Sequence, residues 1–121
     1  MNNNIKILPN GIWVLKNDTH ISRWTEEHNS LNSDPWLFKW LTPLLKDCKI
    51  AFDIGAFIGD HTWPYLNMGM SVYAFEPNPD AFECLEKNCS NAICHNLAAS
   101  DEDGELNFLR NDNAGASHLC A

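Results

Sequence analysis

One short stretch, residues 49–60, constrains this chain more than any other. It reads Lys-Ile-Ala-Phe-Asp-Ile-Gly-Ala-Phe-Ile-Gly-Asp, an apolar run over residues 50–54 that leads into a turn with two glycines. The run predicts a buried strand, and Gly55 and Gly59 allow the positive φ and the close ligand approach that a tight turn into a helix needs. Open α/β sheets bind ligands at the carboxyl ends of their strands, where Asp53 falls. The stretch therefore predicts a strand–glycine loop–helix nucleotide site.

The segments that follow supply neighbours for this strand. Residues 71–76 and 92–97 each read as a further strand, and residues 105–109 alternate like a fourth, half-exposed one. A helix is expected over residues 60–67, and a second helix follows Asn78, which is placed as an N-cap before Pro79. Strands that alternate with short helices predict an α/β fold with a parallel sheet and right-handed crossovers.

The N-terminal part, residues 1–47, reads as a lead-in of one strand and two helices. Its second helix is expected to begin at Pro35 after an Asp34 N-cap, and to end or kink near Thr42 because of Pro43. Five apolar residues fall on one face of this helix: Trp36, Leu37, Trp40, Leu41 and Leu44. The two tryptophans could stack on a ligand, but a stripe that faces the core is the favoured interpretation.

Composition narrows the class of protein. The 121 residues fit one small domain, and a net charge of −8 argues against binding a nucleic-acid backbone. The N-terminal residues show no signal-peptide pattern and no apolar run is long enough to cross a bilayer, so we expect a cytoplasmic protein without a membrane partner.

The five cysteines are expected to be reduced thiols, because their number is odd and no secretion signal accompanies them. Cys84, Cys89 and Cys94, with His95 beside the last, invite a zinc interpretation. Their spacing is wider than that of the usual zinc-binding pairs, and we expect no metal site.

The chemistry of the predicted site depends on two acids. Glu76 follows Asp53 by 23 residues and ends the neighbouring strand, the place where an acid binds the two hydroxyls of a ribose. A dinucleotide loop needs a second glycine where this chain has Phe57, and Asp53 would repel a pyrophosphate while suiting a cationic ligand. The residues therefore favour S-adenosylmethionine over NAD as the cofactor.

Three stretches together resemble the FkbM family of class I methyltransferases that depend on S-adenosylmethionine. They are FDIGAFIGDHT at 52–62, VYAFEPNP at 72–79 and NLAASDEDG at 96–104. The resemblance implies a Rossmann-like class I methyltransferase fold, truncated, with a parallel sheet and flanking helices. It divides the chain into the lead-in, residues 1–47, and a cofactor-binding Rossmann-like half-domain, residues 48–121.

The resemblance also implies which residues hold the cofactor. Glu76 would bind the ribose, and residues 113–118 are similar to the family's small-residue loop ahead of its fourth core strand. The remaining residues would form the cofactor loop and surround the adenine: Asp53, Gly55, Ala56 and Gly59 in the loop; Pro77, Asn78, Asn96, Leu97 and Ala98 around the adenine.

The activity implied by the resemblance is transfer of a methyl group to a hydroxyl oxygen, often of a sugar or another small-molecule scaffold. His61, next to the loop, is a candidate for the base that takes the hydroxyl proton, although a residue in a first helical turn is more often simply solvent-facing. Asp60 is more readily interpreted as a helix cap than as a substrate ligand.

The family's sheet has seven strands, and this chain ends before the fourth. We therefore expect strand 50–54 to present an unpaired apolar edge through which the chain could associate with a partner. One alternative function is a truncated, non-catalytic module that binds S-adenosylmethionine and needs a partner chain to complete its sheet. Another is an NAD-dependent oxidoreductase, which Phe57 and Asp53 disfavour.

Overall fold

The predicted parallel sheet is present in the computed structural model, which describes residues 2–105, 107–109 and 118–120. Three strands form it: β3 (Ile50–Ile54), β4 (Ser71–Phe75) and β5 (Ile93–His95). They pair in the order β3-β4-β5 with all strands parallel. A small three-stranded parallel sheet with flanking helices is compatible with a truncated Rossmann-like fold.

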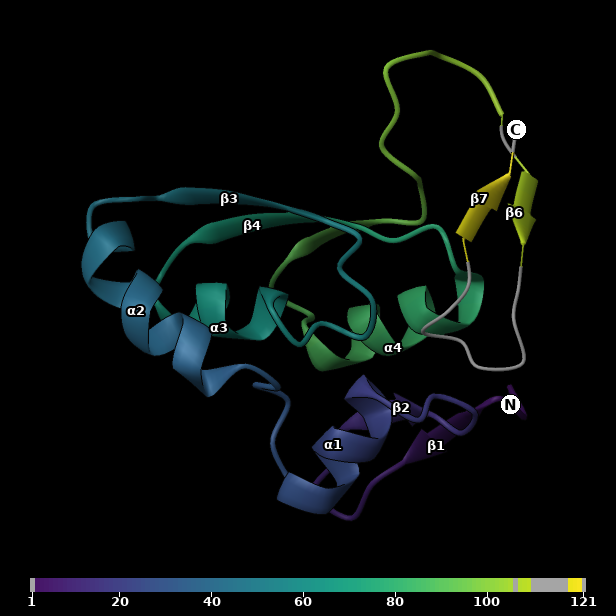
Figure 1. The fold of residues 1–121 in the computed structure, drawn as a ribbon, viewed down its shortest axis with the longest axis horizontal. Coiled ribbons are helices and arrows are strands. Elements are labelled where there is room, and N and C mark those ends of the chain that lie inside the picture. The colour runs from purple at the N-terminus through teal and green to yellow at the C-terminus, as the bar shows by residue number, and fades with distance from the viewer. Residues whose placement is uncertain (1, 106, 110–117, 121) are drawn as a thin grey trace.

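Two helices cover one face of this sheet (Figure 1). α4 (Pro79–Asn88) begins as predicted, because the Asn78 side chain accepts a hydrogen bond from the backbone N–H of Asp80 at 3.0 Å. α3 (Thr62–Asn67) begins later than predicted: its N-cap is His61, which makes no side-chain capping bond, so the cap expected at Asp60 is wrong. Pro64 falls in the first turn, where its missing N–H leaves no partner unsatisfied.

The N-terminal segment forms a hairpin, whose strand β2 packs against α4, and a helix that packs against β2. β1 (Ile5–Ile7) pairs antiparallel with β2 (Trp13–Leu15), and α1 (Ile21–His28) follows. The Asn88 side chain joins the hairpin to the sheet domain, since it bonds both the N–H and the C=O of Trp13 and the C=O of Ile58, each at 2.8 Å. β1 was not predicted, because three residues are too few to show a period.

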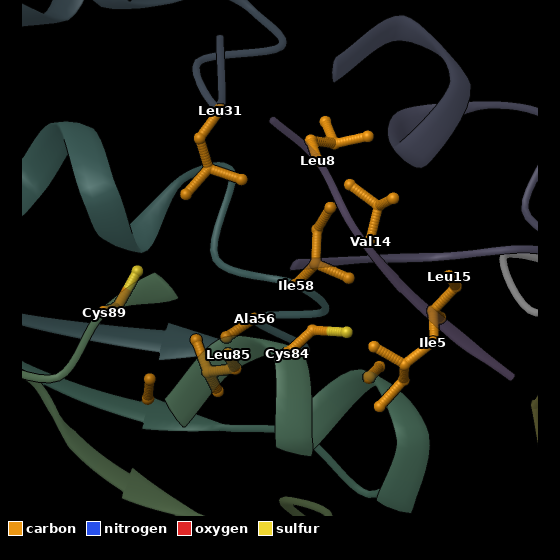
Figure 2. Close-up of a cluster of buried hydrophobic side chains, with 12 residues drawn as sticks. Ile5, Leu8, Val14, Leu15, Leu31, Ala56, Ile58, Cys84, Leu85 and Cys89 are labelled. Carbon is orange, nitrogen blue, oxygen red and sulfur yellow. The ribbon is translucent and has the colours of Figure 1, made fainter. Parts of the chain in front are cut away.

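The buried core draws on residues from both the N-terminal segment and the part of the chain that follows it (Figure 2). The hairpin and the segment around Leu31 face the glycine loop and α4 across this core. Its buried members are Ile5, Leu8, Val14, Leu15, Leu31, Ala56, Ile58, Ala74, Ala81, Cys84, Leu85 and Cys89. The N-terminal segment therefore packs against the loop that carries the predicted site.

Helix α2 (Pro35–Leu45) differs from its prediction in two respects. Asp34 caps it as expected, with its carboxylate accepting from the Leu37 N–H at 3.1 Å, but the helix continues two residues beyond Pro43. Trp36 and Trp40 are 72% and 76% exposed. The core-facing stripe is therefore wrong: α2 buries Phe38 instead.

The C-terminal strands lie outside the parallel sheet. β6 (Asn107–Leu109) falls within the predicted strand, and it pairs antiparallel with β7 (His118–Cys120), which the sequence did not predict. Within the described residues β3 pairs only with β4, so the edge expected at residues 50–54 is present. No helix in the described part of the chain is long and apolar enough to cross a membrane.

Candidate functional site

Glu76 lies at the carboxyl end of β4, and its carboxylate accepts hydrogen bonds from both the glycine loop after β3 and the turn after β4. One carboxylate oxygen, Oε1, accepts from the backbone N–H of Phe57 at 2.9 Å, and Oε2 accepts from the N–H of Asn78 at 2.8 Å. Burial raises the pKa of Glu76, while these two hydrogen bonds lower it in part. Each oxygen keeps a further lone pair, so the carboxylate can hold the loop and still accept from a ligand hydroxyl.

Asp53 lies on β3 and points to the helix-covered side of the sheet. Its Oδ2 accepts a hydrogen bond from the Thr62 hydroxyl at 2.6 Å, which fixes the carboxylate against the start of α3. Oδ1 has no hydrogen-bond partner among the described residues and remains available to a cationic or hydroxyl-bearing group. No pattern in the sequence indicates the role of Thr62, because its contact with Asp53 depends on how α3 packs.

The first two amides of the glycine loop are bonded to the end of β4. The N–H groups of Gly55 and Ala56 both donate to the C=O of Phe75, at 2.9 and 3.0 Å. Gly55 has φ +75° and nothing within 4 Å of where a Cβ would lie, so its conformation requires glycine and the space beside it is open. Ala56 instead buries its side chain in the core.

Gly59 is required for packing. It has φ +101°, and a Cβ there would lie 2.6 Å from Sγ of Cys89, the C-cap residue of α4. The close approach expected at this glycine is therefore made by α4. Burial raises the pKa of the Cys89 thiol to about 12, so Cys89 acts as a neutral packing group.

Phe57 adopts a left-handed conformation, with φ +53°, which is uncommon for an aromatic residue. Its N–H is the one that Glu76 holds, and its ring packs partly against the core. Backbone strain of this kind persists only where the surroundings enforce it. The sequence identified Phe57 as a bulky residue in place of a glycine, but not as a strained one.

Two predicted adenine-side residues have structural partners. Asn78 is buried and caps α4. Asn96 follows β5, and its Nδ2 donates to the backbone oxygens of Glu76 and Pro77, at 2.8 and 3.1 Å. Asn96 therefore holds the segment after β4 against the end of β5.

A cavity of about 620 Å³ opens beside these residues at the carboxyl ends of the strands. Pro77, Leu97 and Ala98, all predicted to surround the adenine, line it together with Ile54 and Phe75. The rest of its wall comes from the acidic segment that follows: Ala99, Ser100, Glu102, Asp103, Gly104 and Glu105. A lining that combines apolar side chains with polar groups suits a flat heterocycle.

His61 lies on the other side of the loop, beside a buried acid. Its Nε2 is 3.8 Å from Oδ2 of Asp60, and its ring meets the edge of Phe38 at a centroid distance of 5.4 Å. The same Asp60 oxygen accepts from the Ser33 hydroxyl at 2.7 Å. Burial raises the pKa of Asp60, while the Ser33 hydrogen bond and His61 lower it in part. Ser33 had no signal in the sequence, because it lies 27 residues away along the chain.

The arrangement fits the cofactor that the sequence favours. Glu76 has acceptor capacity for a ribose, Asp53 has a free oxygen for a positive group, and the adjoining cavity offers room for an adenine. Among the described residues no three His, Cys, Asp or Glu side chains gather as a metal site would require. The predicted loop at residues 113–117 lies outside the described residues.

Comparison with known proteins gives one family. The family model described as "Methyltransferase FkbM domain" matches residues 53–120, more than half of the chain. No curated protein and no solved structure matches this chain. The match begins at Asp53 and contains every residue assigned to the cofactor site above.

Proposed function

Because the chain belongs to the FkbM methyltransferase family, we propose that it binds S-adenosylmethionine at the loop after β3 and serves methyl transfer to a hydroxyl oxygen. The observation that carries this proposal is the family match over the glycine loop and both acids. The bound cofactor would supply a methyl group on a positively charged sulfur. We place the protein in the cytoplasm, with a sugar or another small molecule as the acceptor.

Each acid has a distinct part in the proposed site. Glu76 would accept hydrogen bonds from the ribose hydroxyls with the lone pairs that Phe57 and Asn78 leave free. Asp53 would face the positively charged methionine part through Oδ1, while Thr62 keeps the carboxylate in place. Pro77, with Leu97 and Ala98, would enclose the adenine in the adjoining cavity.

Methyl transfer to oxygen releases a proton, and His61 is our candidate to take it. The imidazole is the side chain suited to proton transfer near neutral pH, and His61 is partly exposed beside the loop. Asp60 lies behind it and would stabilise the imidazolium that forms. The main contribution of the protein would still be to position the two reactants.

Calorimetric titration with S-adenosylhomocysteine and, separately, with NAD tests the cofactor. We expect saturable binding of the first and none of the second. Glu76→Gln should weaken binding by roughly tenfold or more, because one acceptor oxygen is replaced by a donor that faces backbone N–H groups. Glu86→Gln, which makes the same change at an exposed site on α4, should bind like the wild type.

Circular dichroism must show that Glu76→Gln is folded, since Glu76 also holds the loop. Asp53→Asn provides a second test, because it removes the charge and keeps the acceptor for Thr62. Binding of NAD in preference to S-adenosylhomocysteine would refute the proposal and support the oxidoreductase alternative.

A second candidate function is a non-catalytic module that binds the cofactor and is completed by a partner chain. The face of the sheet opposite α3 and α4, which carries the exposed Ile50, Phe52, Ile54 and Ile93 and which we call the open face, favours it, since parallel sheets are normally covered on both faces. In that case S-adenosylhomocysteine binds to the chain, but methyl transfer requires the partner.

A further inference from the structure

A second cavity lies in the N-terminal segment, where α1 lies against the β1–β2 hairpin (Figure 1). We call it the hairpin cavity. Its volume is about 390 Å³, which is within the range of small-molecule sites, and it shares no lining residue with the cavity at the carboxyl ends of the strands. Its lining comes from the hairpin, from α1 and from the turn between them: Lys6, Val14, Leu15, Lys16, Asp18, Thr19, Ser22, Arg23 and Glu26. All of these residues precede the region that the family model matches.

Basic side chains are concentrated around the hairpin cavity. Lys6, Lys16 and Arg23 line it, three of only eight basic residues in a chain with sixteen acids. Lys6 forms an ion pair with Glu26, which joins β1 to α1. Arg23 pairs through Nε with Glu27 at 3.3 Å, so its other guanidinium N–H groups remain available. Lys16 has no side-chain partner among the described residues, and its three N–H donors are free for a ligand.

The two acids in the lining are already occupied by protein groups. Glu26 is neutralised by Lys6. Asp18 is buried, and its Oδ1 accepts a hydrogen bond from the N–H of His20 at 3.0 Å while its Oδ2 accepts from the N–H of Ser22 at 2.6 Å. A carboxylate that is paired or bonded in this way repels an incoming anion less than a free one does. The charge left for a ligand in the hairpin cavity is therefore positive.

The lining also contains a buried hydroxyl group. Ser22 is 2% exposed, and its Oγ accepts a hydrogen bond from the N–H of Leu15 at 3.0 Å. A hydroxyl that accepts one hydrogen bond still has its own proton to donate, and no described residue accepts that proton. Because a buried donor without an acceptor costs free energy, an acceptor oxygen placed in the cavity would be stabilised there.

We propose that the hairpin cavity binds the phosphate group of a small phosphorylated molecule. Lysine and arginine are the usual partners of phosphate, and a dianion gains more from several nearby cations than a carboxylate does. Lys16 and Arg23 would pair with the phosphate oxygens, and the Ser22 hydroxyl would donate to one of them. A phosphate has only a few times the volume of a water molecule, roughly 30 Å³, so most of the cavity remains for the organic part of the ligand.

Two-dimensional NMR of the ¹⁵N-labelled chain, titrated with inorganic phosphate at constant ionic strength, tests this site. We expect the backbone amide signals of Thr19, Ser22 and Arg23 to shift saturably with phosphate but not with acetate, which carries a single charge. Glucose 6-phosphate should shift the same signals with at least the affinity of inorganic phosphate, whereas glucose should not shift them. A higher salt concentration should weaken the binding of both phosphates, because exposed charges are screened.

Substitution of the unpaired lysine gives the matched comparison. Lys16→Gln should weaken phosphate binding several-fold, whereas Lys16→Arg should retain most of it because the charge is kept. Lys46→Gln, which makes the same change at the exposed residue that ends α2, should bind like the wild type. The dispersion of the amide signals shows whether each variant is folded.

Three results would overturn the proposal: no saturable shift at these amides, equal shifts with acetate, or undiminished binding by Lys16→Gln. A response to inorganic phosphate without one to glucose 6-phosphate would indicate an adventitious ion only, and would overturn it as well. None of these titrations involves S-adenosylhomocysteine, so their outcome is independent of the proposed function.

Discussion

The two faces of the three-stranded sheet use the same strands in opposite ways. On the face under α3 and α4, Val72 and Ala74 are almost completely buried and Asp53 is fixed by Thr62. On the open face the side chains are larger, yet Phe52 and Ile54 are mostly exposed. The hydrophobic effect that stabilises this chain therefore acts mainly on one side of the sheet, while the other side leaves its apolar area exposed.

The difference shows that side-chain size is a poor guide to burial in this sheet. Small residues on the covered face let the helices pack closely, whereas the face that no helix covers carries the larger apolar residues. Parallel sheets ordinarily bury both faces, so every strand reads as continuously apolar whichever face is covered. Residues 50–54 alternate large apolar side chains with Ala51 and Asp53, but the large apolar ones are those that the structure leaves exposed.

The largest difference in unfolding free energy is expected between aspartates introduced on the two faces of the sheet. Val72→Asp should cost about 4 kcal/mol or more of unfolding free energy, because it buries an unpaired carboxylate. Phe52→Asp on the neighbouring strand should cost about 1 kcal/mol, the scale of strand preference. Urea unfolding at low protein concentration measures both. Equal losses would mean that the open face is buried in the chain as it folds, and Val72→Ala, at about 2 kcal/mol, calibrates the scale.

Substitution of the two loop glycines should show the same order: the glycine on the covered side should lose more unfolding free energy than the one that faces open space. Gly59→Ala should cost about 3 kcal/mol, since its Cβ would meet Sγ of Cys89 at 2.6 Å on the covered side. Gly55→Ala, which faces open space, should cost about 1 kcal/mol from positive φ alone. Thermal or urea unfolding distinguishes them. Adding Cys89→Ala to Gly59→Ala should recover most of the difference, and failure to recover it would place the strain elsewhere.

Substitution of Asp60 measures how much unfolding free energy the burial of its carboxylate costs. Burial raises its pKa above 3.8, so the folded state releases this proton at higher pH than the unfolded state does. The unfolding free energy therefore decreases as pH rises from about 3.8 through the raised pKa, and then levels off. Asp60→Asn removes this cost and keeps an acceptor for Ser33. We expect the variant to be more stable than the wild type at neutral pH and to differ little from it at pH 3.

Urea unfolding at a series of pH values measures the effect, with the exposed Asp47→Asn as the control. If the gain were the same at every pH, a change in packing would explain it better than ionisation.

The smallest effect is expected at Phe57, in the glycine loop after β3. Phe57→Asn and Phe57→Ala lose the same ring contacts, but asparagine tolerates left-handed φ and alanine does not. The asparagine variant should therefore be more stable than the alanine variant by about 0.5–1 kcal/mol. Unfolding free energies from matched urea titrations give this difference. Equal stabilities would show that the loop shifts out of the left-handed conformation once the ring is gone.

Short-range features of this protein could be predicted from its sequence. The strand at Ile50–Ile54, the positive φ of Gly55 and Gly59, and the Asn78 cap of α4 are all present. Each depends on residues within a few positions of one another, so local preferences determine it. The order of the cofactor motif along the chain also sufficed to place it in its family, as the match over residues 53–120 confirms.

Only the tertiary structure decided how these features are used. Glu76 holds the N–H of Phe57, Ser33 bonds Asp60, and Cys89 makes Gly59 necessary, and each pair is far apart in sequence. Trp36 and Trp40 face solvent because Phe38 is the residue that α2 presents to its neighbours. A hydrophobic pattern states which residues share a face, but burial depends on what the rest of the chain brings against that face. For the open face, the described chain brings nothing, and its large apolar side chains remain exposed.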